Sequence, residues 1–435
     1  MNFENLQKRI DSIARFFLYV LIFWIPFGNA VIESCVGAAF FLWLVKRFLL
    51  IPFGTLKGLS FKEKSQQFLN GFKVKRSFLN FPIVVFLYIC LLSALWSRAP
   101  LYSLHGFISK TLEWFVIYFL ILEFFTEKKH VILALAVFLF SAMSVCVDSF
   151  VQFYVTGKSF FCNAEFIGRA TSCFYAGNGL GGYLLFPLFL SAGFFFLKEN
   201  SKPRKILYGF FSLLIAWTIA ITFSRGAWVA VFVGICLFAF LSKQKFLRVA
   251  ILFLLSVFVL TALFLPSSIK QKARIDPDNF SSTAGWRKDI WVDSFKMIKD
   301  KPLLGHGPNT FMQIFQKKQY RSRPEGRFFD PAYAHNCYVQ MAAETGLLGL
   351  GCFLWILGRF FKNIGSFVLD KRIQGFSSLK MVLVGLWIGA FSFCIHSFFD
   401  NHFYSLKLSI LFWIMAGISV VIHKLLSQEQ ICGIK

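Results

Sequence analysis

Residues 266–346 read PSSIKQKARIDPDNFSSTAGWRKDIWVDSFKMIKDKPLLGHGPNTFMQIFQKKQYRSRPEGRFFDPAYAHNCYVQMAAETG. This long polar segment interrupts a chain that is otherwise almost continuously apolar. It holds 13 Lys and Arg residues, from Lys270 to Arg327, and two histidines, His306 and His335. Its last residues lead directly into another apolar run. Apolar runs on both sides of one basic segment therefore decide the fold class.

The composition of the whole chain predicts an all-α polytopic membrane protein. Of 435 residues, 57% are hydrophobic, 19% aromatic and only 15% charged, with a mean hydropathy of +0.63. A soluble protein of this size cannot bury so much apolar surface. The formal net charge of +25 would indicate nucleic acid in a soluble protein. Here membrane topology accounts for the cations one by one, so we expect membrane lipids around the chain and no nucleic-acid partner.

A spanning helix needs about 20 mostly apolar residues, and about twelve stretches qualify. They lie near 12–27, 29–50, 80–97, 107–125, 130–153, 174–197, 206–222, 226–241, 246–265, 338–361, 379–399 and 403–424. The first has no small-residue cleavage pattern after it, so we expect a span and not a cleavable signal. The domain organisation follows: transmembrane helices 1–9 in 1–265, an extracytoplasmic (periplasmic) loop in 266–337, and transmembrane helices 10–12 in 338–435.

Positive charge orients these spans. The linker from Lys46 to Arg76 holds eight Lys and Arg residues, and other basic linkers fall on the same side if the N-terminus is cytoplasmic. The 266–337 loop then lies outside the cytoplasm. Loops of this length are largely exempt from the positive-inside trend, so topology does not explain its basic charge. We therefore expect the loop to bind a phosphate-rich, lipid-linked substrate.

Two short helices are expected inside the loop. Apolar residues recur at helical spacing from 286 to 299, and Pro302 ends that run. Asn309 is positioned to cap a second helix that reaches about residue 318.

Two arginines are candidates for binding a diphosphate. Arg225 lies between two apolar helices, where an unpaired charge costs several kcal/mol; it is either functional or an interface anchor, and Ser224 beside it keeps the backbone open. Arg287 is expected at a helix N-terminus, the wrong end of the dipole for a cation unless an anion binds there too. The alternative for Arg287 is a solvated surface residue. Arg169 and Asn178 are weaker candidates.

Candidate acid–base residues lie where the chain re-enters the membrane. His335 is the side chain most easily used as a base near neutral pH. Asp400, expected at the end of the eleventh span on the same face, could orient an imidazole or an acceptor hydroxyl, or simply cap the next helix. We expect His396 to lie above it on one helical face. Glu344 is half a turn out of phase with His335, which favours a supporting role in helix packing.

Other patterns carry little. Asp276-Pro277-Asp278 matches a metal-binding DxD pattern but is expected outside the cytoplasm, where nucleotide sugars are absent. The ten cysteines form no CxxC pair, and no HExxH, GxSxG or Walker loop occurs. We therefore expect no metal ion and no cofactor. Cys162 and Cys173 share one predicted outer loop and form either a disulfide or two free thiols.

Three motifs together resemble the O-antigen ligase/polymerase superfamily. They are Thr222-Phe223-Ser224-Arg225-Gly226, then Gly285-Trp286-Arg287…Trp291…Pro302-Leu303-Leu304-Gly305-His306-Gly307, then His335-Asn336…Glu344-Thr345-Gly346-Leu347-Leu348-Gly349. The resemblance covers about 169–400. It implies a glycosyltransferase of the bacterial inner membrane that faces the periplasm. Such an enzyme moves a glycan from undecaprenyl diphosphate to an acceptor, in ligases a sugar of lipid A-core, with inversion and without metal or nucleotide.

Carried over by this resemblance, Arg225 and Arg287 would bind the diphosphate; Arg169, the weaker candidate from the residues themselves, is expected to join them. His335 would activate the acceptor hydroxyl and Asp400 would assist, supported by Ser224, Asn336 and Glu344. Many relatives carry a second histidine where this chain has Tyr333, which leaves His335 as the only imidazole of that pair. A polymerase acting on the same carrier, a protein O-glycosylating enzyme and a polysaccharide or lipid transporter remain alternatives.

Overall fold

The chain is described from a computed structural model. It describes residues 3–51, 63, 65–66, 70–162, 164–165, 168–197, 199–242, 277–317, 319–320, 333–369 and 379–431. Within these ranges every regular element is a helix and no strand is present. The elements are α1 (Phe3–Trp24), α2 (Asn29–Leu49), α4 (Asn80–Leu95), α5 (Pro100–Gly106), the π-helix η2 (Phe107–Leu112), α6 (Glu113–Phe124), α7 (Lys128–Val151), the π-helix η3 (Gln152–Thr156), α8 (Gly177–Phe195), α9 (Lys202–Ile221), α10 (Arg225–Ser242), α13 (Pro277–Asp300), α14 (Phe311–Phe315), α15 (Cys337–Leu369), α16 (Leu379–His396), the 3-10 turn η5 (His402–Tyr404) and α17 (Leu406–Ile431).

Seven of the described helices are long and apolar enough to cross a membrane: α2, α7 with η3, α8, α9, α15, α16 and α17. Two shorter apolar helices, α4 and α10, accompany them. The predicted class of an all-helical, multi-pass membrane protein is confirmed to this extent. The count of about twelve spans stays a prediction. The predicted spans 12–27 and 107–125 coincide with α1 and with η2 and α6, which are helical but are not among the seven. The predicted span 246–265 lies outside the described residues.

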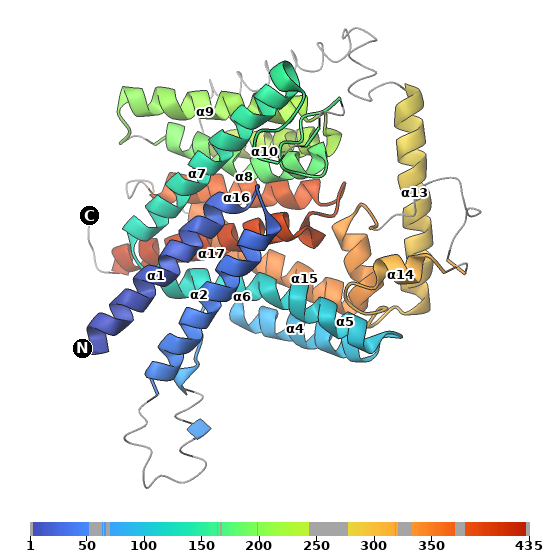
Figure 1. Ribbon diagram of the computed structural model, residues 1–435, viewed down its shortest axis with the longest axis horizontal. Coiled ribbons are helices and arrows are strands. Elements are labelled where there is room, and N and C mark those ends of the chain that lie inside the picture. Colours follow the sequence, from blue (N-terminus) through green and yellow to red (C-terminus); the bar gives the residue numbers. More distant parts are fainter. Residues whose placement is uncertain are drawn as a thin grey trace.

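Three helices form the centre of the bundle. About three quarters or more of each of α8, α16 and α17 is buried (72%, 78% and 83% of the apolar window), against 22% for α2 and α9, which are therefore peripheral. Figure 1 shows α16 and α17 crossing the middle of the molecule, with both termini at one end and α13 and α14 at the other. Large aromatic side chains fill the core of the bundle, among them Trp413 on α17, Tyr118 on α6 and Phe86 on α4.

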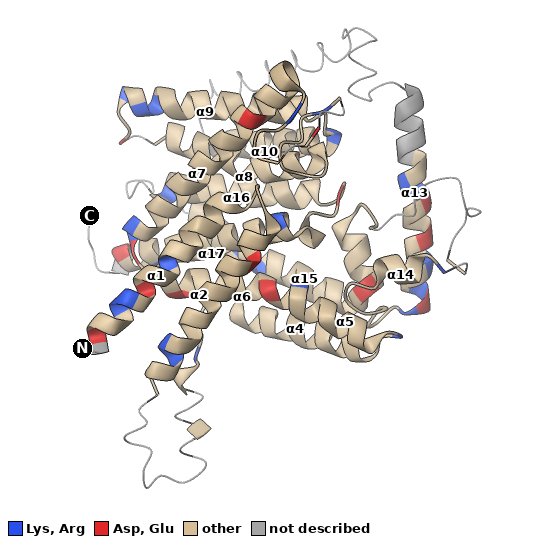
Figure 2. Cartoon of the chain, viewed as in Figure 1, with Lys and Arg blue, Asp and Glu red and all other residues tan. Residues whose placement is uncertain are grey.

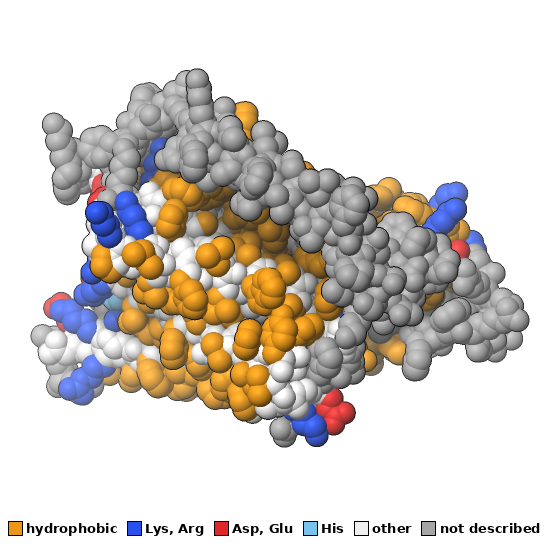
Figure 3. All heavy atoms as spheres, turned by 90° about the horizontal axis from the view of Figure 1, so that it is seen from above, with side chains coloured by type: hydrophobic (Ala, Val, Ile, Leu, Met, Phe, Trp, Pro, Cys, Tyr) orange, Lys and Arg blue, Asp and Glu red, His pale blue; other side chains and the backbone are white. Residues whose placement is uncertain are grey.

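Charged side chains lie mainly at the two ends of the bundle (Figure 2). Figure 3 shows hydrophobic side chains over the middle of one face, with Lys and Arg toward its left edge. At the end that carries the termini, Lys46 contacts Asp11 (2.7 Å) and Glu123 (3.1 Å), and Arg47 contacts Glu123 (2.5 Å). An apolar belt between polar ends is what a bilayer requires of a spanning bundle.

The 302–307 turn is fixed against α15 by backbone pairing. His306 N–H donates to the Ala343 carbonyl (3.1 Å), and Gly307 N–H donates to the Glu344 carbonyl (2.7 Å). At this point α15 kinks at Gly346, whose φ of 71° favours glycine. A Cβ there would also overlap the carbonyl oxygen of the turn. The kink therefore gives the turn its place on the helix.

Three local expectations are wrong in detail. First, α13 begins at Pro277, so Arg287 lies in the middle of a helix and not at its N-terminus; the dipole argument does not apply to it. Second, the second loop helix is shorter than expected, and Asn309 does not cap it: the Asn309 backbone has φ 63° and its side chain accepts from Lys110 (2.6 Å). The Glu344 carboxylate instead accepts the backbone N–H groups at this helix start.

The third correction concerns Asp400. Helix α16 ends at His396, and Asp400 follows in a turn, so the two do not share a helical face. The turn is held to the start of α15, because Cys337 N–H donates to the Ser397 carbonyl (2.9 Å) and Cys337 Sγ contacts the Asp400 carbonyl (3.3 Å). This brings Asp400 beside the residues that precede α15.

Candidate functional site

Asp400 lies at the centre of a hydrogen-bonded group of side chains. Its Oδ1 is 3.2 Å from His335 Nδ1 and accepts the Asn401 backbone N–H (2.8 Å). Its Oδ2 accepts from Asn178 Nδ2 at the start of α8 (2.7 Å). Because a carboxylate only accepts, His335 donates from Nδ1, and in the neutral imidazole this leaves the lone pair on Nε2. The pair therefore has the arrangement of a base with its orienting carboxylate.

The Asp400 carboxylate is kept ionised by its surroundings. Burial alone would raise its pKa, but the hydrogen bonds from His335 and the Asn401 amide outweigh burial, and the pKa of Asp400 lies well below its usual value. The His335 side chain is 29% exposed and that of Asp400 is 19% exposed. The imidazole is therefore accessible to a substrate, while the carboxylate behind it is mostly covered.

His335 is held in an uncommon backbone conformation. Its φ is 51°, which costs energy for a residue with a Cβ and occurs most often where function requires it. Asn336 directly after it caps α15, since Asn336 Oδ1 accepts the backbone N–H groups of Tyr338 (3.0 Å) and Val339 (3.1 Å). The ring of Trp286 on α13 lies 5.1 Å from the imidazole. The loop helix thus packs directly on the candidate base.

Arg169 contacts the turn between α9 and α10, which Arg225 follows. Arg169 donates from Nε to the Thr222 carbonyl (3.0 Å) and from Nη2 to the Phe223 carbonyl (2.8 Å). Phe223 has φ 49°, a strained value for an aromatic residue, and it is followed by Ser224 and then by Arg225, the first residue of α10. Both cations are therefore placed by one turn.

Arg169 also connects to the Asp400 group. Its Nη2 lies 3.5 Å from Asn178 Oδ1, and Asn178 donates to Asp400. From the other side, Arg287 on α13 interacts electrostatically with Asp400: burial lowers the pKa of Arg287, and the Asp400 charge opposes this. Within the described residues, the Arg287 Nε atom is buried without a hydrogen-bond partner. Residues from four separate segments thus surround one carboxylate.

The structure adds His402, whose place in the site the sequence did not indicate, to His396, which was expected near Asp400. His396 and His402 flank Asp400, with their ring centroids 4.2 Å apart and side chains 0% and 2% exposed. Burial lowers the pKa of His402 to about 4, so its imidazole is neutral at pH 7. The sequence signal was present as the repeated histidines of the segment 396–402, but only the end of α16 turns both rings inward.

Glu344 lies apart from His335, as expected, although His335 precedes α15 and the two do not share a continuous helix. It accepts the backbone N–H groups of Asn309 (2.9 Å) and Phe311 (3.1 Å), and also contacts Gln340 Nε2 (3.3 Å). Gln340 in turn accepts from the Ala334 N–H (3.1 Å), one residue before His335. A cavity of about 50 Å³ adjoins Glu344 on mostly apolar walls, but it is not lined by the Asp400 group. Glu344 therefore holds the loop in place without contacting the candidate base.

Among the side chains that the structure describes, no three His, Cys, Asp or Glu residues are grouped as metal ligands. The side chains of the DxD segment, residues 276–278, lie outside those described.

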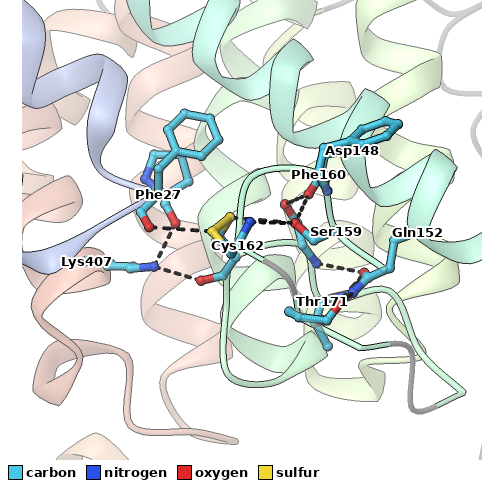
Figure 4. The surroundings of a disulfide bond; sticks show 12 residues. Phe27, Asp148, Gln152, Ser159, Phe160, Cys162, Thr171 and Lys407 are labelled. Carbon is cyan, nitrogen blue, oxygen red and sulfur yellow. Dashed lines mark hydrogen bonds between the residues drawn. A yellow bond between two sulfur atoms is a disulfide. The ribbon is translucent and has the colours of Figure 1, made fainter. Parts of the chain in front are cut away.

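The loop 157–176 is closed by a disulfide between Cys162 and Cys173, which decides between the two alternatives left open by the sequence. Buried Asp148 at the end of α7 supports it, accepting from Ser159 Oγ (2.8 Å) and Phe160 N–H (2.6 Å). Figure 4 shows these side chains converging beneath the loop. Arg169 lies in the segment that this disulfide closes.

Lys407 attaches the same loop to the rest of the bundle. Its ammonium group donates to the carbonyls of Pro26 and Cys173, both at 2.7 Å, and lies 5.2 Å from the centre of the Phe174 ring (Figure 4). Helix α17, the α1–α2 hairpin and the disulfide loop therefore meet at one cation.

The chain is similar to known proteins over part of its length. Residues 209–354 match the family model described as O-antigen ligase. The chain is 25% identical over 197 residues to an uncharacterized protein of Haemophilus influenzae (41% of this chain, 49% of the relative). It is 25% identical over 197 residues to the O-antigen ligase of Salmonella typhimurium (43% and 46%). It is 22% identical over 225 residues to the ComP-specific O-oligosaccharyltransferase of Acinetobacter baylyi (51% and 38%).

These alignments span about half the length of the curated relatives, or less. The resemblance to O-antigen ligases that the three sequence motifs indicate is confirmed. The matched segment contains Ser224, Arg225, Arg287, His335 and Glu344, whereas Arg169, Asn178 and Asp400 lie outside it.

Proposed function

We propose that this relative of the O-antigen ligases is a membrane glycosyltransferase. It would move a glycan from an undecaprenyl-diphosphate carrier to an acceptor hydroxyl, with lipid A-core as the acceptor. The observation that carries the proposal is the His335–Asp400 pair, with a partly exposed imidazole. Arg287 interacts with Asp400, and Arg169 is connected to it through Asn178. Arg225 follows the turn that Arg169 contacts. A base beside a cluster of cations suits a reaction in which a hydroxyl loses a proton and a diphosphate leaves.

The proposed topology places this site at the periplasmic face of a bacterial inner membrane. It includes about twelve spans, in 1–265 and 338–435, and a large periplasmic loop in 266–337. Two observations support it: basic linkers follow one side of the predicted spans, and the 157–176 loop carries a disulfide, a bond that persists in oxidising compartments.

In the proposed reaction the acceptor oxygen attacks the anomeric carbon in a single displacement. His335 Nε2 takes the hydroxyl proton, the new carbon–oxygen bond forms, and the bond from the anomeric carbon to the diphosphate breaks with its electron pair leaving on the phosphate. The anomeric configuration therefore inverts. Asp400 keeps the Nδ1 proton in place and stabilises the imidazolium that forms. General base catalysis of this kind raises the rate by about 10²–10⁴.

Negative charge increases on the leaving diphosphate as this bond breaks. Arginine guanidinium groups donate to phosphate oxygens in a planar fork and stay charged. Fixed cations that face this developing charge lower the barrier, each by about 3 kcal/mol when the site is shielded from water. Arg225 and Arg287, with Arg169, would supply this stabilisation, and the proposed reaction uses neither a metal ion nor a nucleotide.

One observation supports a different acceptor for the glycan. One relative is named an O-oligosaccharyltransferase, so a protein hydroxyl is an alternative acceptor for the same donor and the same base. A polymerase that joins repeat units on the carrier would also use this chemistry. A transporter is the alternative from another class, and it predicts ionisable groups along the mid-bilayer; the described candidate groups gather at one end of the bundle.

The proposal is tested by reconstituting the full chain in vesicles. Carrier-linked glycan and lipid A-core are supplied in one sample with chelator and in another with added magnesium. We expect glycosylated lipid A-core at equal rates in both, and loss of product in the His335→Ala and Arg225→Ala proteins. Elongated glycan on the carrier would identify a polymerase instead. Movement of lipid between leaflets with no glycosidic bond formed would refute the enzyme proposal altogether.

A further inference from the structure

His396 lies where three helices meet at glycines. A Cβ on Gly226 of α10 would come within 2.8 Å of the His396 ring, and one on Gly181 of α8 would come within 2.8 Å of the Ala227 Cβ. On Gly182 it would come within 2.9 Å of His402. The glycines thus let α8 and α10 approach the end of α16, and the two imidazoles fill the space between them.

His396 contacts the turn that places two of the candidate cations. Its Nε2 is 3.3 Å from Ser224 Oγ, and both side chains are buried, at 0% and 1% exposed. Ser224 follows Phe223, whose positive φ needs support from its surroundings, and it precedes Arg225. The hydrogen bond therefore fixes the residue between the strained backbone and the cation.

The same histidine begins the turn that carries Asp400. The Phe399 N–H donates to the His396 carbonyl (2.8 Å). The His396 ring also packs against the ring of His402, which follows Asp400 in the sequence. One buried residue thus contacts the arginine-bearing turn 222–226 with its side chain and holds the 397–402 turn with its backbone. These turns carry the two halves of the proposed site.

A phenylalanine ring would fill this space without burying polar atoms. The His396 Nδ1 atom is buried without a partner among the residues described, and a buried polar atom left unpaired is unfavourable. Packing alone does not explain an imidazole here. The hydrogen bond to Ser224 is the property that an apolar ring of the same size lacks.

We propose that His396 is a positioning residue that sets the place of the 222–226 turn, and with it Arg225, relative to the His335–Asp400 pair. This inference rests on the proposed function and adds a residue that contacts no reacting atom. Removing the hydrogen bond leaves the base intact but misplaces a cation that faces the diphosphate in the bound donor and in the transition state, so donor binding and the chemical step both weaken.

The test uses the full chain in vesicles and the variants His396→Phe, His396→Gln, Ser224→Ala and the double variant His396→Phe/Ser224→Ala. Gln restores a hydrogen-bonding group at the place of Nε2 as donor or acceptor. Losing one hydrogen bond corresponds to about five- to tenfold in an equilibrium constant. We expect His396→Phe and Ser224→Ala each to lower kcat/KM for the donor about five- to tenfold, with a higher donor KM as part of the change. His396→Gln should stay within threefold of the natural protein.

The double variant separates positioning from general damage. If the two side chains act through one hydrogen bond, the double variant lowers kcat/KM no more than either single change. The inference is overturned if the effects of the two single changes multiply in the double variant. It is also overturned if KM is unchanged in His396→Phe and Ser224→Ala, or if His396→Gln does not restore function. Ser224→Ala removes the bond from the other partner, so the test survives if His396→Phe does not fold.

Binding of undecaprenyl diphosphate without glycan distinguishes this inference from the proposed function. If Arg225→Ala leaves that affinity unchanged, the proposed diphosphate site is wrong. If Arg225→Ala weakens binding while His396→Phe and Ser224→Ala do not, the diphosphate site stands and only the positioning role of His396 is wrong.

Discussion

Replacing Asp400 by asparagine tests the arrangement around the candidate base most directly. The carboxylate accepts from His335 and the Asn401 backbone at Oδ1, and from Asn178 at Oδ2. An asparagine has one accepting oxygen and one donating NH₂ group. If its oxygen faces His335, its NH₂ meets the NH₂ of Asn178. If it is reversed, His335 must move its proton to Nε2 and loses the lone pair that takes the acceptor's proton.

The size of the effect follows from the distances. A unit charge about 4 Å from the imidazolium contributes about 4 kcal/mol at an effective dielectric constant of about 20, and partial exposure of both side chains reduces this to about 2–4 kcal/mol. One factor of ten in rate corresponds to about 1.4 kcal/mol. We therefore expect Asp400→Asn to lower kcat by about 30- to 1000-fold, with a smaller change in the donor KM.

A second substitution turns this into a test of geometry. In the double variant Asn178→Asp with Asp400→Asn, the carboxylate and the amide exchange places, so the new amide can accept from His335 and donate to the new carboxylate on α8. The hydrogen bonds are complete again, although the charge is farther from the imidazole. We expect the exchange to recover at least about tenfold in kcat over Asp400→Asn. Glu165→Gln, an exposed carboxylate change in the 157–176 loop, is the matched control.

Initial rates of glycan transfer in vesicles, at saturating acceptor, measure these effects. Thermal unfolding of each variant in detergent shows whether the fold is retained. The reasoning is refuted if Asp400→Asn stays within threefold of the natural rate. It is also refuted if the exchange variant folds normally but gains nothing over the single change, because the Asn178 contact would then have no part in orienting the base.

Three further predictions concern stability and the 157–176 loop. His402 has a pKa of about 4 against an ordinary 6.5, so the unfolded chain binds more protons between these values; stability is complete above pH 6.5 and falls toward pH 4, by about 2 kcal/mol at pH 5. His402→Phe should flatten this dependence in thermal unfolding. Gly346→Ala should lower the free energy of unfolding by at least about 1–3 kcal/mol through backbone strain, whereas Gly351→Ala, with open space around it, should not; equal shifts in the unfolding temperature would contradict the role of the kink. Cys173→Ser should weaken undecaprenyl diphosphate binding through Arg169, and no weakening in a protein that remains folded would show that the disulfide does not position this arginine.

Much of the bundle follows from the sequence because its signal is local. Apolar runs of membrane length predict helices wherever they occur, and eleven of the twelve predicted stretches coincide with helical segments of the described chain. The loop helix around Trp286 follows from apolar spacing in the same way. The start of this helix at Pro277 was missed, because residues 277–285 carry no apolar stripe from which a helix could be predicted.

The sequence identified several residues of the site, but not how those residues are arranged. Positive charge in an apolar setting marks Arg225, and a histidine at the membrane boundary marks His335, from sequence alone. The contacts among Asp400, Asn178 and His335 join segments separated by 65 and 222 positions, and no local pattern encodes such distances. The position of Asp400 depends on where α16 stops, and helix ends are the least certain part of a pattern.

The Lys407 anchor has a bearing on how the 157–176 loop can change. Its polar partners are two main-chain carbonyls, those of Pro26 and Cys173, and a peptide group offers its oxygen whatever side chain the residue carries. The hydrogen bonds from Lys407 therefore depend little on which side chains the loop carries. Substitutions in that loop that keep Arg169 thus leave intact the joint that holds the loop to the helices.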